Sequence, residues 1–305
     1  MEEEGTAGAG EMSLLPEGCI ANVISFTTPC DACRLSSVSR LFKSAAESDA
    51  VWERFLPPEY PTLISNSTSP SSPSSSSSFG FSSKKDLYLS LCDNPILIDD
   101  GKKSFSLDKR SGKKCYMISA RDLMIVWGDT PTYWKWSSIS QARFSEVAEL
   151  ICVCWFEIRA RISTSSLSPR TLYTAYFVYK PTAGAYGFEY QPVEVSVGLV
   201  GSESQIRTVY LHAERGRRQR HQFPRRTGLF HRSRSWGWQA AMPKENDGYY
   251  PKERGDEWLE IELGDYFNEG DEEGDLEMSV LEVTGGDWKG GIIVQGIELR
   301  PKQVK

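Results

Sequence analysis

From residue 103 onward the chain consists of short apolar runs that are too brief for helices. They are rich in β-branched and aromatic residues, and Gly, Pro or Ser bounds each of them. The runs lie at 151–158, 172–179, 193–197, 258–263 and 292–299. No long helical pattern separates them, so residues 103–305 are predicted to form an antiparallel β-sandwich. A short helix at 145–150 is the expected exception.

Residues 12–58 have a different pattern, typical of short amphipathic helices. Pro16 suits the first helical position, and the apolar residues after it follow helical spacing: Cys19, Ile20, Val23 and Ile24. Further helices are expected to begin at caps Thr28, Ser37 and Ser48 or Asp49, and the Pro57-Pro58 pair ends the last one. A module of this size is near the lower limit for a self-sufficient core, so a surface shared with a partner would stabilise it.

Three segments complete the predicted organisation. Residues 1–11 are expected to be a disordered lead. Residues 59–85 contain a serine-rich stretch of low complexity, which predicts a flexible tether. Residues 86–102 are expected to form a helical connector that packs through Leu87 and Leu91 on one of the two domains.

Charge and cysteine content narrow the functional classes. The net charge of -6 argues against general attraction to nucleic acid or to acidic membranes. The acidic start is unlike a signal peptide, and no apolar run approaches the roughly 20 residues that span a bilayer. Seven cysteines cannot all pair, which favours reduced thiols in the cytoplasm and nucleus. Cys30 and Cys33 lack a second pair at zinc spacing, so no metal and no cofactor are predicted.

Two opposed charge blocks lie in the last third of the chain. Residues 215–234 hold eight arginines and no acid, whereas residues 256–277 hold eleven carboxylates and no Lys or Arg. Each is a solvated face or loop by default. The arginine run is also compatible with a nuclear-import or nucleic-acid patch.

Aromatic residues crowd around a Gly-Asp-Thr-Pro turn within residues 115–136. They are Trp127, Tyr133, Trp134 and Trp136. One interpretation is that they plug the end of the sandwich, because large aromatics dominate core energetics. The other is a binding loop held by strands, in which a flat indole covers the apolar face of a sugar ring.

This stretch resembles the opening of the phloem-protein-2 domain, the Nictaba type of plant lectin. The resemblance continues in order through residues 143–150, 154–159, 173–180, 186–198, 257–268 and 290–301. It implies a jelly-roll-like lectin domain with sugar binding on Trp127, Trp134, Asp275 and Glu282. This chain has aspartate at position 275, where the lectin has glutamate. The apolar phase slips at Val280-Leu281, and a β-bulge there would set Asp275 and Glu282 on the same outer face.

The N-terminal module resembles the F-box, which docks a substrate receptor on the Skp-type adaptor of SCF ubiquitin ligases. The resemblance rests on the order Leu15-Pro16, Ile20, Val23, Cys33-Arg-Leu35, Val38-Ser-Arg-Leu41-Phe42 and Trp52. The candidate adaptor-binding residues among them are Leu15, Pro16, Ile20, Val23, Leu35 and Trp52. The resemblance implies that these residues serve adaptor binding or the module core, two roles that sequence does not separate.

The sequence therefore predicts a non-catalytic receptor subunit of a ubiquitin ligase. Its expected partners are the Skp-type adaptor, through it the cullin, and a target protein that is N-glycosylated or bears N-acetylglucosamine. The alternative is a lectin that acts in stress or defence without ubiquitin transfer. An enzyme is disfavoured, since His212, His221 and His231 all lie in or beside the arginine run, away from any nucleophile-base pattern.

Overall fold

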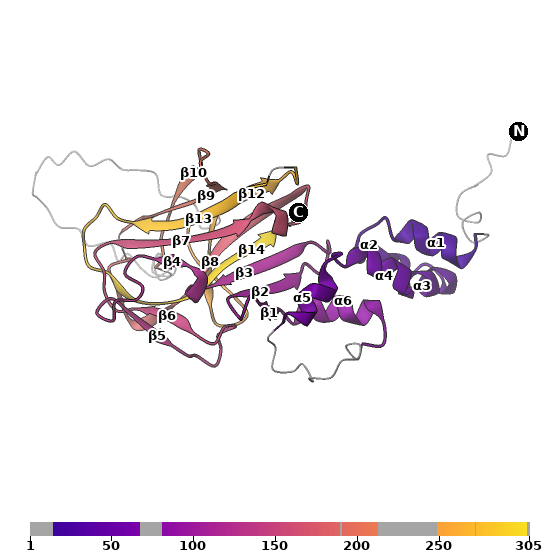
Figure 1. Cartoon of the computed structure of the whole chain (residues 1–305), viewed down its shortest axis with the longest axis horizontal. Coiled ribbons are helices and arrows are strands. Elements are labelled where there is room, and N and C mark those ends of the chain that lie inside the picture. The colour runs from indigo at the N-terminus through magenta and orange to yellow at the C-terminus, as the bar shows by residue number, and fades with distance from the viewer. Residues whose placement is uncertain (1–14, 68–80, 190, 213–248, 272, 304–305) are drawn as a thin grey trace, which may run out of the picture.

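The structure, a computed structural model, describes residues 15–67, 81–189, 191–212, 249–271 and 273–303. A helical module lies at one end of the molecule and an antiparallel β-sandwich at the other (Figure 1). The predicted fold class is confirmed.

Four short helices form the N-terminal module: α1 (Glu17–Ile24), α2 (Pro29–Leu35), α3 (Arg40–Glu47) and α4 (Asp49–Phe55). The predicted cap of α2 is present, since the Asp31 amide donates to Thr28 Oγ1 at 3.1 Å. Helix α3 is capped by Ser39 instead of Ser37, through a 3.2 Å bond from the Phe42 amide. The apolar sides of the helices converge on Trp52, whose Nε1 donates to the Ala46 carbonyl at 2.7 Å.

Two further helices pack against this module, α5 (Tyr60–Ser65) and α6 (Lys84–Asp93). The Lys84 amide donates to Asp49 Oδ1 at 2.8 Å, and Lys84 Nζ lies 2.9 Å from Glu53 Oε2. The serine-rich residues 68–80 are outside the described ranges, but the chain on both sides of them belongs to the same module. The flexible tether expected over residues 59–85 thus contains helix α5, and its serine-rich part falls outside the described residues.

The helical module also packs directly on the sandwich. The Tyr88 hydroxyl of α6 donates to the Asp108 carbonyl at 3.1 Å, and Lys114 Nζ lies 2.9 Å from Glu59 Oε1. Gly112, at φ +71°, brings its Cα close to α2 and α4. Most of the buried apolar residues form one cluster that runs from Ile20 to Leu299, and a second, smaller cluster surrounds Trp258. The two parts consequently share one core.

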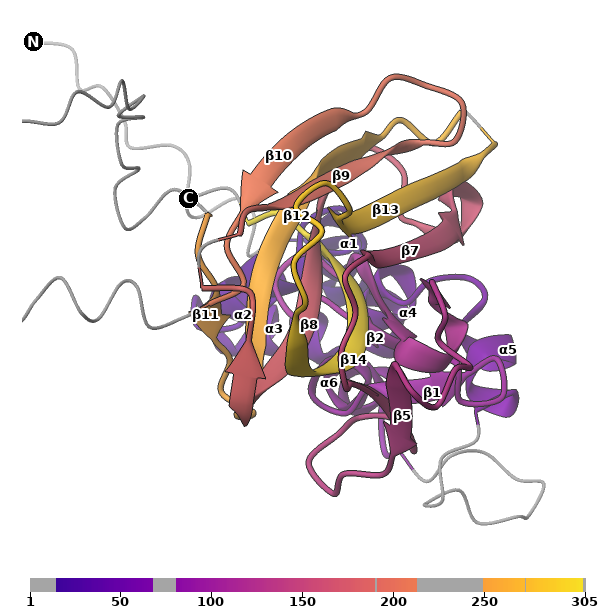
Figure 2. The same ribbon diagram turned by 90° about the vertical axis from the view of Figure 1, so that its left-hand side faces the viewer.

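The sandwich has two sheets, and every strand pair in them is antiparallel. The nine-stranded sheet contains β1 (Ile96–Ile98), β2 (Lys103–Leu107), β3 (Lys114–Ser119), β5 (Trp134–Ser137), β6 (Val147–Leu150), β8 (Thr171–Tyr186), β11 (Lys252–Glu253), β12 (Leu259–Asn268) and β14 (Gly290–Pro301). The five-stranded sheet contains β4 (Met124–Ile125), β7 (Phe156–Ser163), β9 (Val193–Leu199), β10 (Gln205–Val209) and β13 (Asp275–Glu282). Figure 2 shows β10, β9, β13 and β7 as one layer over β12, β8 and β14.

Two local expectations were wrong. The expected helix at 145–150 contains strand β6, because pairing with β5 and β14 buries Val147, Ala148 and Leu150. The expected connector 86–102 is helical only through α6. It then contributes strand β1, so the sheet begins before residue 103.

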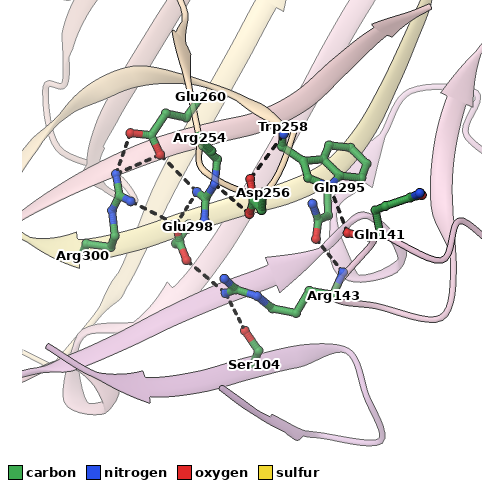
Figure 3. A network of polar contacts seen from close by, with 10 residues as sticks. All are labelled: Ser104, Gln141, Arg143, Arg254, Asp256, Trp258, Glu260, Gln295, Glu298 and Arg300. Carbon is green, nitrogen blue, oxygen red and sulfur yellow. Dashed lines mark hydrogen bonds and ion pairs between the residues drawn. The ribbon is translucent and has the colours of Figure 1, made fainter. Parts of the chain in front are cut away.

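A polar network covers the outer face of the nine-stranded sheet (Figure 3). Glu298 is at its centre, with its carboxylate 3.0 Å from Arg143 and 2.6 Å from Arg254. Arg300 lies 2.9 Å from Glu260, which also contacts Arg254 at 3.1 Å. Several acids of the predicted solvated face are thus paired with arginines. Burial by itself raises the pKa of Glu298, but the three arginines outweigh burial and hold it below its ordinary value.

Candidate functional sites

The predicted adaptor-binding residues fall into two groups. Leu15 and Val23 are 40% and 48% exposed, and Pro16 is exposed beside them. Ile20 and Trp52 are 0% and 1% exposed and belong to the module core. Leu35 is half-buried against the same core. Of the six residues, only Leu15, Pro16 and Val23 offer a surface to a partner.

The exposed apolar surface at helix α1 extends beyond these three residues. Phe26 is 67% exposed, and Cys19 is exposed on the same side at helical spacing from Pro16 and Val23. We call Leu15, Pro16, Cys19, Val23 and Phe26 the α1 stripe. The helical spacing of Cys19 and Phe26 from Pro16 and Val23 was the sequence signal that could have placed them in this stripe. Helix α1 lies at the end of the molecule away from the sandwich (Figure 1).

The two tryptophans implied in sugar binding have different environments. Trp134 is 2% exposed, packs 6.3 Å from the Phe156 ring and donates through Nε1 to the Val126 carbonyl at 3.2 Å. It plugs the end of the sandwich. Trp127 is 44% exposed and lies in the left-handed backbone region at φ +57°. Its ring packs on Tyr133, with centroids 5.2 Å apart.

The two acids lie on opposite faces of β13. The register of β13 with β7 is unbroken from Asp275 to Glu282, and its pairing with β9 is also regular. The expected β-bulge at Val280-Leu281 is therefore wrong, and with it the shared acid site. Asp275 is exposed opposite Ser163, at the other end of β7 from the Glu282 partner Phe156.

Glu282 points into the sandwich, where it pairs with a buried lysine. It is 4% exposed and forms an ion pair with Lys289, which is 0% exposed. Glu282 Oε1 accepts the Gly285 amide at 2.9 Å, and Lys289 Nζ donates to the Cys154 and Asp287 carbonyls at 3.0 and 2.8 Å. This geometry fixes the turn between β13 and β14 and leaves neither charge available to a ligand.

Sequence reasoning missed two exposed tryptophans near Trp127. Trp155 and Trp288 are 42% and 54% exposed. The apolar pattern predicts Trp155 inside a strand, whereas the strand starts only at Phe156. Trp288 lies in the stretch Gly285-Gly-Asp-Trp-Lys-Gly-Gly, and an aromatic among glycines was a usable signal for a displayed loop residue.

Other chemistry is sparse in the part of the chain that the structure describes. Within it there is no group of three or more metal-ligating side chains, and no helix is long and apolar enough to cross a membrane. All seven cysteines lie in the described ranges as free thiols. The arginine run at 215–234, with His221 and His231, falls outside those ranges.

Comparison with known proteins decides the family. The phloem protein 2 family model matches residues 113–301. Three Arabidopsis thaliana proteins align over nearly the whole chain: F-box protein PP2-B10 at 44% identity (95% of this chain, 93% of that protein), F-box protein PP2-B15 at 42% (96% and 98%) and F-box protein PP2-B1 at 42% (99% and 93%). The chain belongs to the phloem protein 2 family.

This phloem protein 2 chain also carries an F-box, whose family model matches residues 12–54. Among solved structures, the CBM22-1 xylan-binding domain of Paenibacillus barcinonensis Xyn10C aligns with 61% of this chain and 90% of its own. Its identity is 11% and its TM-score 0.26, too low to support an argument about function. In this phloem protein 2 domain the resembling blocks at 143–150, 257–268 and 290–301 supply Arg143, Glu260 and Glu298 to the network of Figure 3.

Proposed function

We propose that this phloem protein 2 chain is the substrate-recognition subunit of an SCF-type ubiquitin ligase. The F-box binds a Skp-type adaptor and through it the cullin, and the sandwich recruits the target, a glycoprotein. The chain performs no bond chemistry in this role. It acts by proximity, raising the effective concentration of target lysines near the charged ubiquitin enzyme. The cytoplasm and nucleus are the compartments that suit this role.

The observation that carries this proposal is the α1 stripe. It lies on an F-box, and a helix that leaves this much apolar surface exposed is typical of a protein-binding face. The stripe belongs to the end of the molecule away from the sandwich (Figure 1), so an adaptor bound there would leave the sandwich free for a target.

The test is co-purification of the full-length chain with a plant Skp-type adaptor. The Leu15→Ala, Pro16→Ala double variant and a Val23→Glu variant should each lose at least about tenfold in affinity, equivalent to about 1.4 kcal/mol. These positions are exposed, so the fold should persist. Ile206→Ala is the matched control, because Ile206 is a 68% exposed apolar residue on the sandwich. Unchanged adaptor binding in both stripe variants would contradict the proposal.

The exposed tryptophans favour a second candidate, a carbohydrate-binding lectin that acts without ubiquitin transfer. Wild-type chain that binds glycans but no adaptor would establish this function in place of the first.

A further inference from the structure

Three serines lie in the loop between α2 and α3, and the fold uses two of them. Ser36 Oγ donates to the Cys33 carbonyl at 2.6 Å, and Ser39 Oγ accepts the Phe42 amide at 3.2 Å. Ser37 is exposed, and its hydroxyl makes no hydrogen bond to any other residue that the structure describes. The hydroxyl of Ser37 is therefore accessible and has no structural role to lose on modification.

This loop lies at the edge of the α1 stripe. Glu17 at the start of α1 accepts a 2.6 Å hydrogen bond from the Ser44 hydroxyl near the end of α3. The two helices pack side by side (Figure 1), so they run in opposite directions and the start of α3 lies beside the end of α1. Val38, which is 64% exposed, thus extends the stripe at the end that carries Phe26. A group added to Ser37 would lie under a partner that covers this surface.

Two exposed arginines flank the free hydroxyl. Arg34 lies three residues before Ser37, and Arg40 three residues after it. Arg34 Nη1 is 3.0 Å from Asp31, but the Arg34 side chain is 69% exposed, and a surface pair of this kind contributes little. The Arg34 guanidinium is therefore accessible to a carboxylate-lined site, which it can bind through paired hydrogen bonds. Protein kinases select their substrates by such charge patterns around the acceptor.

The loop can reach the active site of a modifying enzyme at low cost. Around Ser37 the backbone is held by two turn bonds, from the Ser37 amide to the Arg34 carbonyl at 3.1 Å and from the Val38 amide to the Leu35 carbonyl at 3.0 Å. Segments with few bonds and an exposed backbone open locally at a small free energy. Ser37 can consequently extend away from the module without unfolding it.

From this arrangement we infer that Ser37 is a phosphorylation site for a protein kinase that selects arginine three residues before the acceptor, and that its modification switches off adaptor binding. The kinase transfers the γ-phosphoryl group of ATP. A bond forms between Ser37 Oγ and the γ-phosphorus, the bond from that phosphorus to the β,γ-bridging oxygen breaks, and ADP leaves. The hydroxyl proton passes to a carboxylate of the kinase.

The switch follows from the place of the phosphate beside apolar surface. A phosphoserine carries about −1.5 to −2 charges at pH 7, and in a hydrophobic interface it disrupts binding by its cost of desolvation. Val38 and the α1 stripe supply the apolar side of that interface, whereas Arg34 and Arg40 can pair with the phosphate only while the surface is uncovered. The inference deepens the proposed function and rests on it for the identity of the partner as the adaptor.

The first arm of the experiment treats the full-length chain with ATP and a basophilic kinase of the calmodulin-dependent class, and locates the phosphate by mass spectrometry. Ser37 should be modified. Arg34→Gln should slow its modification at least about tenfold, because it removes the charge that the kinase reads. Arg40→Gln is the matched control, an exposed arginine on the other side of the acceptor, and should change the rate less than about twofold.

The second arm measures adaptor affinity before and after kinase treatment. Phosphorylated wild-type chain should bind the Skp-type adaptor at least about tenfold more weakly than untreated chain. Ser37→Glu should weaken binding in the same direction. Ser37→Ala should bind as wild type does and should keep its affinity after treatment, which excludes an effect of phosphate elsewhere. Ser202→Glu adds the same charge at an exposed serine on the sandwich and should have no effect.

The two arms separate this inference from the ligase role. A kinase that leaves Ser37 unmodified, or phosphorylated chain with unchanged adaptor affinity, would overturn the inference while the ligase function stands. Untreated chain that captures no adaptor would contradict the ligase function and the switch together, and the kinase arm would still decide whether Ser37 is an acceptor.

Discussion

Glu282 and Lys289 form an ion pair that is buried from solvent on both sides, seven residues apart across the turn between β13 and β14. The pair lies directly beneath the turn that displays Trp288. A charge pair removed from water in this way is costly to break, because the remaining ion has no solvent to replace its partner.

Lys289→Met should therefore reduce the free energy of unfolding by about 3–5 kcal/mol, measured by urea denaturation. The double variant Lys289→Met, Glu282→Gln should recover part of the loss, since it removes the unpaired charge and retains an acceptor for the Gly285 amide. Lys302→Ala is the control. It breaks a pair with Asp265 that is far more exposed and should cost less than about 1 kcal/mol. Equal losses for Lys289 and Lys302 would contradict the burial argument.

Glu298 should make folding sensitive to acid. Its folded-state pKa lies below the unfolded value of about 4.3, so the folded state binds fewer protons. The stabilisation is complete above pH 4.3 and is lost as the pH falls through the folded pKa. Urea unfolding between pH 3 and pH 7 should show Glu298→Gln to be less stable at neutral pH and less dependent on acid. Parallel pH curves for the two proteins would exclude this role.

The shared core should hold the chain together after a backbone cut between Ser67 and Phe81. A protease site placed there should yield two fragments that elute together from a sizing column, because α6 packs on α4 and holds the module through Lys84 and Asp49. Fragments should separate only in denaturant. Separation under native conditions would mean that the helical module and the sandwich are independent bodies.

Gly290 should tolerate no side chain. A Cβ at this position would lie 2.1 Å from the Ile151 carbonyl oxygen, which is backbone and has little freedom to move. Gly290→Ala should cost about 1–3 kcal/mol, as overpacking of well-packed regions does. Gly255→Ala, where the added Cβ meets no atom within 4 Å, should change the unfolding free energy by less than about 0.5 kcal/mol. Thermal unfolding of the two variants makes the comparison.

Local signals in the sequence predicted much of the fold. Thr28, Pro29 and Asp31 define the start of α2 because capping chemistry involves only residues within one turn. The failures have tertiary causes. Residues 147–150 form a strand because β14 pairs with them, and β14 lies more than 140 residues away.

The candidate site was harder to predict for the same reason. The apolar phase slip at Val280-Leu281 suggests a bulge, because an inward glutamate is improbable without knowledge of its partner. Lys289 is that partner, and nothing in the pattern of β13 reveals it. The burial of Trp134 likewise depends on Phe156 and Val126, which residue spacing does not specify.

Residues 68–80 connect α5 and α6, two helices of the same body, so this segment can change in length at little cost. A loop whose ends are already held together grows at an entropic cost of only about 0.6 kcal/mol per doubling. Insertions and deletions there should leave the contacts of α6 with α4 and with the sandwich in place. This position is accordingly suited to receive a fluorescent reporter, an affinity tag or an entire inserted domain without disturbing either end of the receptor.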